Sequence, residues 1–365
     1  MSTPRPPGVL NDPSARTLIA GDLEAVFLPG YGMLCASLRH RGEEILRRVE
    51  DLETSAARGS TAGIPLLHPW ANRLAKLRYG AAGREVELDP SSPLLHFDEH
   101  GLPIHGVPWS RLTWEVTENR QDSLVARLDW TRGELLAVFP YRHQMQLAAT
   151  LCPDGLAFET TLNAGVDDPV LVSFGFHPYL GLPGLSRAQW RLTLPPMRKL
   201  VLDRQGIPTG EEEPFGGFDS CLDERDFDDG FAQPEDEISF SVKGAGRRVS
   251  VELLAGYRYA QVFAPKDQDY IALEPMTAPA GALTSGRGLR IVQPGQKFPD
   301  GIPDFYWHGP RTIRWIHRAA INFVEDAAQA SGIFRGCWIR HGDEPRLTPS
   351  AFPCWREKAP FSPRN

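Results

Sequence analysis

The sequence of 365 residues contains few cysteines, no long apolar run and no excess of positive charge. Its five cysteines are odd in number and scattered, without a CxxC pair or a metal-ligand spacing, which indicates idle thiols rather than a disulfide framework. No stretch approaches the roughly 20 apolar residues that a membrane-spanning helix needs. The net charge of −7 argues against a nucleic-acid or anionic-membrane partner. A reducing cytoplasm is the simplest location.

The N-terminal segment also lacks an apolar stretch. Met1 to Thr17 is rich in Pro, Ser and Arg and does not have the pattern of a secretory signal. We expect residues 1–10 to form a disordered N-terminus.

Helical periodicity is missing from most of the chain. Before residue 300 no apolar pattern at positions i, i+3, i+4 and i+7 is sustained, and no GxGxxG motif is present. A Rossmann-type or barrel-type α/β enzyme is therefore disfavoured. The 34 Gly and 33 Pro follow no repeat and indicate many turns between short strands.

A two-residue alternation is the main pattern that is present. Odd positions are mostly apolar over residues 141–151, and even positions are apolar over residues 156–162. The turn sequence Pro153-Asp154-Gly155 joins the two runs, so the segment predicts an antiparallel hairpin. Similar runs lie at residues 123–130, 247–254 and 257–263. With 41% hydrophobic residues to fill a core, the sequence predicts an all-β fold, a large antiparallel β-sandwich over residues 11–295.

The C-terminal part has a different composition. Residues 296–365 hold four of the nine tryptophans and two of the five cysteines, with many Arg and Pro, and the alternation is lost. A weakly helical stretch from Thr312 to Ala330 is the one ordered element expected there. We expect a peripheral tail of uncertain fold that supplies no catalytic group, so that a chain ending near Asp300 keeps its activity, with lower stability if Thr312 to Ala330 caps a sheet edge.

Two loop segments place polar side chains among Gly, Pro and aromatic residues. In Gly63–Arg73, Asn72 and Arg73 follow a Pro-Trp step that disfavours helix, and an amide beside a guanidinium could hold vicinal hydroxyls. A surface loop with an arginine salt bridge is the alternative. In His100–Trp109, two His-Gly steps between prolines indicate a rigid loop, in which His105 is either a structural group or part of a site.

Two strand segments carry ionisable groups at their ends. His177 follows an apolar strand in Leu171–Leu180, and its ordinary pKa near neutrality suits proton transfer. Glu274 ends an apolar strand in Tyr270–Pro279 and is followed at once by Pro275. Burial of such a carboxylate would raise its pKa toward the range of a general base. A hydrogen-bonded core histidine and a rim-exposed glutamate are the alternatives.

Taken together, in this order and spacing, these segments resemble the aldose 1-epimerase (galactose mutarotase) family. The resemblance covers roughly residues 11–295. It is carried by the sequences PWANR (69–73), IHG (104–106) with Trp109, FHPYL (176–180), FDDGF (227–231), AQVF (260–263) and LEPMTAP (273–279).

This resemblance implies a galactose mutarotase-like supersandwich and an isomerase that interconverts the α and β anomers of a hexose. It matches His177 to the family's general acid and Glu274 to its general base. The positions matched to sugar binding are Asn72, Arg73, His105, Asp228 and Gln261. Asp229 is the other carboxylate of the FDDGF segment and differs from Asp228 by one residue of register.

The chemistry needs a proton removed from the C1 hydroxyl while the ring oxygen gains one. A carboxylate and an imidazolium on opposite sides of the hemiacetal suffice, without a metal or an organic cofactor. A small-molecule sugar is therefore the expected partner, with no nucleic acid and no membrane. The sequence does not indicate an oligomeric state.

Two other functions fit the same segments. A hexose-6-phosphate 1-epimerase would need a cationic phosphate pocket, for which Lys76, Arg78, Arg142 and Arg198 are candidates. A non-catalytic sugar-binding protein of the same fold would not need both proton-transfer groups. At the C-terminus the chain departs from the family pattern, because turn residues follow Pro294-Gly295-Gln296 where a last strand usually closes the sheet.

Overall fold

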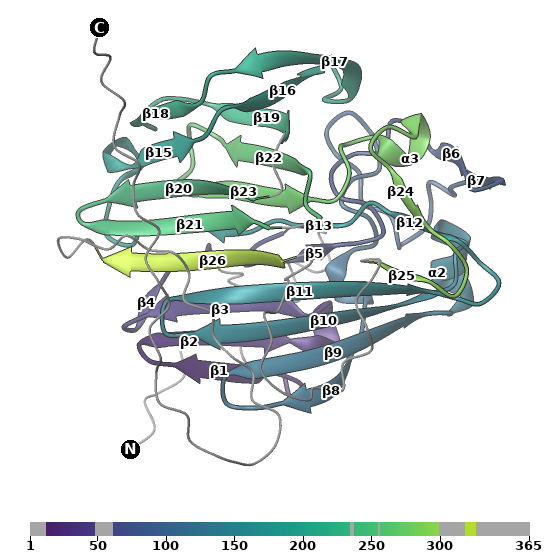
Figure 1. Ribbon diagram of the computed structural model, residues 1–365, viewed down its shortest axis with the longest axis horizontal. Helices are drawn as coiled ribbons and strands as arrows, with labels where there is room; N and C mark the ends of the chain where they lie inside the picture. The colour runs from purple at the N-terminus through teal and green to yellow at the C-terminus, as the bar shows by residue number, and fades with distance from the viewer. Residues whose placement is uncertain (1–11, 48–60, 234–236, 255, 299–317, 326–365) are drawn as a thin grey trace, which may run out of the picture. The chain divides into compact units, whose positions relative to one another are not determined.

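The structure is a computed structural model that describes residues 12–47, 61–233, 237–254, 256–298 and 318–325. All of these residues belong to one compact unit, Met1–Ile333. Antiparallel strands make up most of it (Figure 1). The expected all-β fold is therefore confirmed.

The elements follow one another along the chain with short connections. In the first half they are β1 (Arg16–Ala20), β2 (Leu23–Leu28), η1 (Pro29–Tyr31), β3 (Leu34–His40), β4 (Glu43–Glu44), β5 (Leu66–Leu67), β6 (Arg78–Ala81), β7 (Arg84–Glu87), η2 (Trp109–Arg111), β8 (Glu115–Asn119), β9 (Ser123–Trp130), α2 (Gly133–Val138), β10 (His143–Cys152), β11 (Gly155–Ala164), β12 (Val170–Val172), β13 (Gly175–Phe176) and β14 (Tyr179–Leu180). In the second half they are η3 (Arg187–Gln189), β15 (Arg191–Leu194), β16 (Met197–Leu202), β17 (Pro208–Phe215), β18 (Phe218–Cys221), β19 (Phe227–Ala232), β20 (Ile238–Gly244), β21 (Arg247–Leu253), β22 (Tyr259–Ala264), β23 (Ile271–Met276), α3 (Ala282–Ser285), β24 (Arg290–Val292), β25 (Lys297–Phe298) and β26 (Arg318–Glu325).

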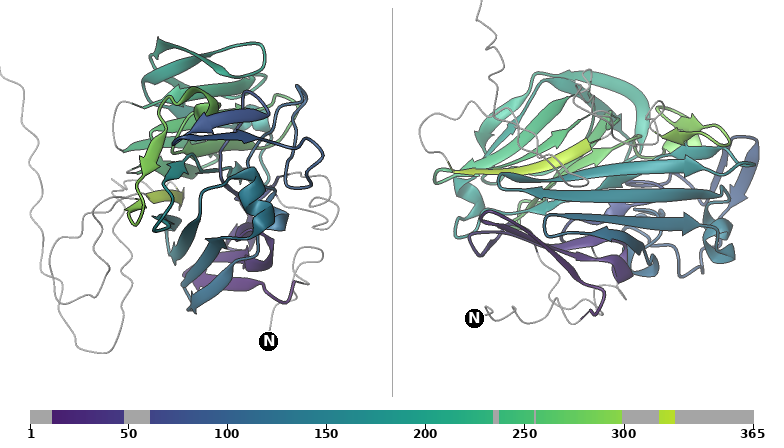
Figure 2. Two further views of the ribbon diagram at one scale, coloured as in Figure 1. Left: turned by 90° about the vertical axis from the view of Figure 1, so that its right-hand side faces the viewer. Right: turned by 60° about the horizontal axis from the view of Figure 1, so that its bottom comes forward.

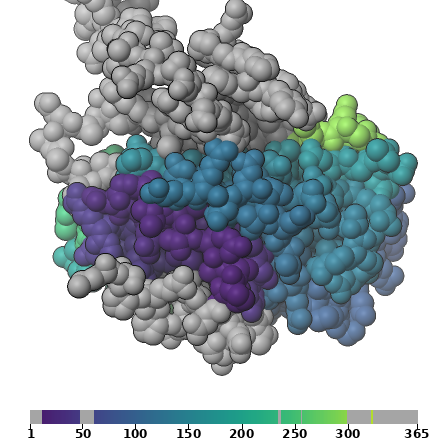
Figure 3. All heavy atoms as spheres, turned by 90° about the horizontal axis from the view of Figure 1, so that it is seen from below, coloured from purple at the N-terminus to yellow at the C-terminus, as the bar shows by residue number. Residues whose placement is uncertain are grey.

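Two large sheets organise the described residues. A ten-stranded sheet has the order β18-β15-β20-β21-β26-β11-β10-β9-β8, with β25 paired to β11. An eight-stranded sheet has the order β17-β16-β19-β22-β23-β13-β5, with β14 paired to β23. Strands β1 to β4 form a smaller sheet that packs against β9 and β10, and Figures 2 and 3 show these purple strands beside the blue and teal segments.

The hairpin expected around Pro153-Asp154-Gly155 is present. Strands β10 and β11 pair from His143↔Ala164 to Cys152↔Gly155, so that Pro153 and Asp154 form a two-residue loop. The apolar positions Met145, Leu147, Leu151, Leu156, Phe158 and Leu162 are buried, as the alternation predicts.

A shared hydrophobic core joins the three sheets. The ring of Phe158 in β11 lies 6.0 Å from that of Phe27 in β2 and 5.0 Å from that of Phe176 in β13. Burial of each such ring contributes about 1.5–3 kcal/mol. The face of the eight-stranded sheet that turns away from this core is the one that carries the polar residues described below.

The sheet continues beyond residue 295, where the sequence predicts a tail. Strand β26 lies inside the ten-stranded sheet, paired with β21 on one side and with β11 on the other. The helical interpretation of Thr312–Ala330 is therefore wrong at residues 318–325, where pairing on both sides outweighs local propensity. Ile321 is buried, and Nδ2 of Asn322 donates to Oε1 of Glu252 at 2.7 Å. The rest of the expected tail and of the N-terminal segment 1–10 lies outside the described residues.

The cysteines are not all idle thiols. Cys35 is buried and free, and Cys221 is exposed and free. Cys152 is disulfide-bonded, so the expectation of free thiols is wrong at this position.

Candidate active site

Three polar residues lie in a row across the middle of the eight-stranded sheet. Gln261 in β22 is paired with Glu274 in β23. On the other side of β23, Gly175 pairs with Met276 and Tyr179 pairs with Ala272, so His177 lies midway, opposite Glu274. Directly opposite residues share one face of a sheet. Gln261, Glu274 and His177 therefore form a continuous polar row.

The other face of the same strands belongs to the core. Val262 and Leu273, which are paired with each other, are fully buried in the hydrophobic cluster. Because side chains alternate along a strand, this burial turns Gln261 and Glu274 to the opposite face. Glu274 thus lies inside β23, and the expectation that it ends a strand is wrong.

His177 and Glu274 are in direct contact. Nε2 of His177 lies 3.2 Å from Oε1 of Glu274, and the two side chains are 5% and 2% exposed. The His177 backbone N–H donates to the carbonyl of Pro65 at 3.1 Å, which holds this residue between β13 and β14. The alternative of a rim-exposed glutamate is therefore wrong, because Glu274 is buried against His177.

Burial opposes charge on both members of the pair. It raises the pKa of Glu274 well above its usual value, with the negative charge of Asp228 adding to the effect and Arg73 opposing it. Burial also lowers the pKa of His177 well below its usual value, and His105 and Arg47 lower it further. Such opposed shifts at two neighbouring groups are typical of sites of proton transfer.

The two expected loops are bonded to each other beside this pair. The His105 N–H donates to the carbonyl of Asn72, and the Val107 N–H donates to that of His68, each at 2.9 Å. Asn72 and His105 both adopt the left-handed backbone region, with φ of 57° and 62°. Asn72 and Arg73 are buried. The alternative of an exposed surface loop is therefore wrong, although Arg73 does form a salt bridge.

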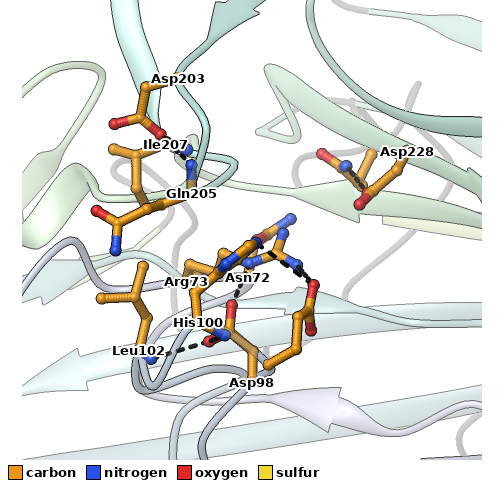
Figure 4. Close-up of polar contacts among 11 residues, drawn as sticks. Asn72, Arg73, Asp98, His100, Leu102, Asp203, Gln205, Ile207 and Asp228 are labelled. Carbon is orange, nitrogen blue, oxygen red and sulfur yellow. Dashed lines mark hydrogen bonds and ion pairs between the residues drawn. The ribbon is translucent and has the colours of Figure 1, made fainter.

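Arg73 is held by two carboxylates. Its Nε lies 2.6 Å from Oδ2 of Asp98 and its Nη2 lies 3.5 Å from Oε1 of Glu99. Oδ1 of Asp98 accepts hydrogen bonds from the N–H groups of His100 and Leu102, which fixes the loop (Figure 4). Asp98 is not among the residues expected from the sequence, because no local pattern links it to a loop 25 residues earlier.

A second loop faces Arg73 from the other side. Between β16 and β17, Oδ1 of Asp203 accepts from the N–H groups of Gln205 and Ile207 at 2.8 and 3.0 Å. Figure 4 shows this loop and the Asp98 loop on either side of Arg73. A Cβ atom at Gly206 would lie 2.9 Å from Nη1 of Arg73, so a side chain there would require the guanidinium to shift. This loop was also not expected from the sequence.

Asp228 lies at the exposed side of the site. Nε2 of Gln261 donates to Oδ1 of Asp228 at 2.6 Å, and Asp228 is exposed while Gln261 is buried. Asp229 points elsewhere and pairs with Lys199 at 2.7 Å. Of the two carboxylates in this segment, Asp228 is the one that adjoins the polar row.

His105 completes the arrangement next to His177. Their rings meet edge to face with centroids 5.3 Å apart. Burial lowers the pKa of His105 to about 3, with Arg73 and His96 adding to the effect. Its Nδ1 is buried without a partner in the described part of the chain, beside a hollow lined by Thr61, His96 and Trp109. The structure thus brings all seven residues expected from the sequence into one region.

The described residues contain no group of three or more His, Cys, Asp and Glu side chains arranged to hold a metal ion. None of the helices in the same residues is long and apolar enough to cross a membrane.

Comparison of the sequence with known proteins identifies the family of this chain. The family model of aldose 1-epimerase matches residues 16–302. The uncharacterized protein YihR of Escherichia coli (strain K12) is 26% identical over 261 residues, which are 64% of this chain and 77% of that protein.

Solved structures show the same fold. A galactose mutarotase-like protein from Clostridium acetobutylicum has a TM-score of 0.68 at 18% identity, covering 84% of this chain and 94% of its own. Galactose 1-epimerase from Lactobacillus acidophilus NCFM has a TM-score of 0.62 at 14% identity, covering 85% and 93%. The expected galactose mutarotase-like sandwich is confirmed, and the chain belongs to the aldose 1-epimerase family.

Proposed function

We propose that this protein is an aldose 1-epimerase that interconverts the α and β anomers of a hexose. The observation that carries the proposal is the 3.2 Å contact between Nε2 of His177 and Oε1 of Glu274. The C1 hydroxyl and the ring oxygen of a pyranose are bonded to the same carbon. Groups that exchange protons with these two oxygens must therefore be neighbours, as His177 and Glu274 are.

In the proposed mechanism Glu274 is the general base and His177 the general acid. When the proton that the pair shares lies on His177, the Glu274 carboxylate takes the proton of the C1 hydroxyl while His177 gives its own to the ring oxygen, and the bond from C1 to the ring oxygen breaks. The aldehyde rotates about the C1–C2 bond, and the reverse transfers close the ring on the other face. The acid and base act side by side, and not from opposite sides of the hemiacetal as the sequence suggested.

The remaining site residues are proposed to hold the sugar. Arg73 and Asn72 on their loop, His105 beside His177, and Asp228 with Gln261 surround the proton-transfer pair with donors and acceptors for hydroxyl groups. Asp228 is exposed and the pair is buried, which supports entry of a sugar from the Asp228 side with C1 innermost. These roles need no cofactor, since only protons move.

A hexose 6-phosphate is a less suitable substrate, because two of the arginines considered for a phosphate pocket are already paired with carboxylates. Arg78 is exposed and paired with Glu85, and Arg198 is partly exposed and paired with Glu212. Arg73, the cation of the site, is already paired with Asp98. A purely sugar-binding role would leave the buried acid–base pair without a purpose, because burial of both groups costs stability.

The test is anomerisation of freshly dissolved α-D-glucose and α-D-galactose, followed by polarimetry, with and without a 6-phosphate. The proposal expects accelerated rotation change with an unphosphorylated hexose. Acceleration restricted to the 6-phosphates would favour a hexose-6-phosphate 1-epimerase, and binding without acceleration would favour a non-catalytic sugar-binding protein.

A cytoplasmic location is also part of the proposal, and fractionation of cells that produce the protein would test it.

A further inference from the structure

An aromatic and cationic group lies against the outer face of the proton-transfer pair. The ring of Tyr179 in β14 stacks on His177, with centroids 4.1 Å apart and planes 15° from parallel. The guanidinium carbon of Arg47 lies 5.7 Å from the centroid of Tyr179 and 4.8 Å from that of Tyr270. Tyr179 and Tyr270 meet edge to face at 5.3 Å. None of these three residues has a role in the proposed proton transfers.

Among the described residues, His105 and Phe263 meet the imidazole of His177 edge to face, with centroids at 5.3 and 6.3 Å, and Tyr179 alone is parallel to it. Its Nε2 faces Glu274, but its Nδ1 is buried without a hydrogen-bond partner in the described part of the chain. A histidine that serves as acid or base is usually oriented by a hydrogen bond to its second nitrogen. In the described residues no other residue bonds to Nδ1, so ring packing contributes to the orientation, and Tyr179 makes the parallel contact.

Tyr179 is itself firmly held. Its hydroxyl bonds with the hydroxyl of Thr61, and its backbone N–H donates to the carbonyl of Gly63 at 2.9 Å. Its carbonyl accepts from the N–H of Arg47 at 2.9 Å. Cation–π contact with the exposed Arg47 adds to this support. The ring is therefore a rigid support.

We propose that Tyr179 is the positioning residue of this site: its ring fixes the plane of the His177 imidazole, so that Nε2 stays directed at the anomeric centre beside Glu274. The inference rests on the proposed function for its kinetic part. The ionisable groups that face His177 are Glu274 from β23, His105 from its loop, Tyr179 from β14 and, behind Tyr179, Arg47. Replacement of Tyr179 leaves the charges of the other three in place.

The experiment compares Tyr179→Leu with Tyr179→Phe. Tyr179→Leu removes the stacked ring, and we expect kcat to fall about 10–100-fold with KM and calorimetric sugar affinity unchanged, because misplacement of a reacting group costs about this much. Tyr179→Phe keeps the ring and loses only the bond to Thr61, so it should restore kcat. The matched control is Phe174→Leu, which removes a buried ring that contacts Tyr257 and Phe298 and should leave kcat unchanged.

A second measurement uses the free protein and does not depend on activity. The stacked ring of Tyr179 should shift the ring-proton resonances of His177 upfield in NMR spectra, and Tyr179→Leu should abolish that shift while Tyr179→Phe keeps it. An unchanged shift in Tyr179→Leu would overturn the inference, as would equal loss of kcat in both variants. If the wild-type chain anomerises no sugar, the proposed function fails while the resonance shift still decides the positioning role.

Arg47→Gln covers the case in which Tyr179→Leu does not fold. Arg47 is exposed, so this variant should be folded. Loss of the cation should raise the pKa of His177 and loosen Tyr179, and we expect a smaller upfield shift together with an acid limb of the pH–rate profile at higher pH. An Arg47→Gln protein with both features unchanged would count against the support of His177 by this group.

Discussion

At the scale of single residues, the site depends on two buried ionisable side chains, and the positive charge of Arg73 only partly offsets the burial of Glu274. Burial favours the neutral carboxyl of Glu274 and the neutral imidazole of His177. A pair that is 3.2 Å apart titrates as a unit, so the state with one shared proton persists over a wide pH range. In the proposed mechanism the shared proton lies on His177 when the sugar reacts, so that Glu274 is the acceptor and His177 is the donor.

The first prediction concerns Glu274→Gln and His177→Asn. Glu274→Gln keeps shape but removes the base, and His177→Asn removes the acid, so each should lower kcat by about 10²–10⁴-fold. Calorimetric sugar affinity should change little, because Asn72, Arg73 and Asp228 would still hold the ring. Polarimetry measures the first quantity and calorimetry the second.

The double variant provides the control for joint action. Residues that act as one unit are not additive, so its kcat should fall much less than the product of the two single effects. Near-wild-type turnover of Glu274→Gln would eliminate the mechanism. Lost affinity with unchanged kcat would make Glu274 a ligand for a hydroxyl group only.

The second prediction follows from the raised pKa of Glu274. Above the ordinary pKa of 4.5 the unfolded chain ionises this residue while the folded chain keeps it protonated, so its contribution to stability is lost as the pH rises toward the folded pKa. Glu274→Gln does not titrate. We therefore expect the free energy of unfolding of Glu274→Gln to exceed that of the wild type by an amount that grows between pH 5 and pH 8. Urea unfolding of both proteins at these two pH values measures it, and a constant difference would contradict the raised pKa.

At the scale of elements, the register of three strands creates the polar row, and this register is not visible in the sequence. The alternation in residues 141–162 predicts a hairpin because the two strands are neighbours in the chain. The pairing of β13 and β14 with β23 joins segments about a hundred residues apart, and no local pattern records it. Glu274 is a clear case, since Pro275 suggests the end of a strand while pairing across the sheet keeps both residues inside β23.

The loop between β16 and β17 yields the third prediction. Gly206 has a φ of 74°, and a Cβ atom there would lie 2.9 Å from Nη1 of Arg73. We expect Gly206→Ala to displace the guanidinium and to raise KM about tenfold or more, which is the loss of one hydrogen bond to a charged group. The effect on kcat should be smaller, because His177 and Glu274 keep their contact.

The matched control for Gly206→Ala is Gly184→Ala. Gly184 has nearly the same φ, 73°, and a Cβ atom there would meet nothing within 4 Å. Both variants carry the cost of a left-handed alanine, about 1–2 kcal/mol, so the difference between their melting temperatures cancels that strain and leaves the effect of the contact with Arg73. An equal KM for the two variants would show that the loop does not act on Arg73.

At the scale of the whole molecule, the sequence indicates the fold class and the members of the site better than their arrangement. The motif residues from Asn72 to Glu274 meet in one region as expected, because each lies in or beside a turn or strand that the sequence pattern predicts. The supports Asp98 and Gly206 were not expected, since they act through contacts with Arg73 that no spacing reveals. The prediction of a peripheral tail is wrong at residues 318–325 for the same reason, because β26 forms by pairing with its neighbours β21 and β11.

The last prediction corrects the expectation that a chain ending near Asp300 keeps its activity. Such a chain lacks β26, which separates β21 from β11 in the ten-stranded sheet. Its removal would leave both strands with unpaired N–H and C=O groups, and it would expose the surface that Ile321 covers. Each lost backbone bond costs about 1 kcal/mol, and their sum approaches the 5–15 kcal/mol that is roughly the total stability of a domain.

We therefore expect the chain ending at residue 300 to be unfolded or aggregated, and a chain ending at Ile333, the last residue of the compact unit, to fold. Ile321→Asp in the full-length protein tests the same strand without truncation, because it places an unpaired charge in the core. Circular dichroism and size-exclusion chromatography measure folding, and polarimetry then measures activity in the chains that fold. A chain ending at residue 300 with the melting temperature of the Ile333 chain would show that the ten-stranded sheet holds without β26. Such a result would support the hypothesis, based on the composition of residues 296–365, that the tail is peripheral.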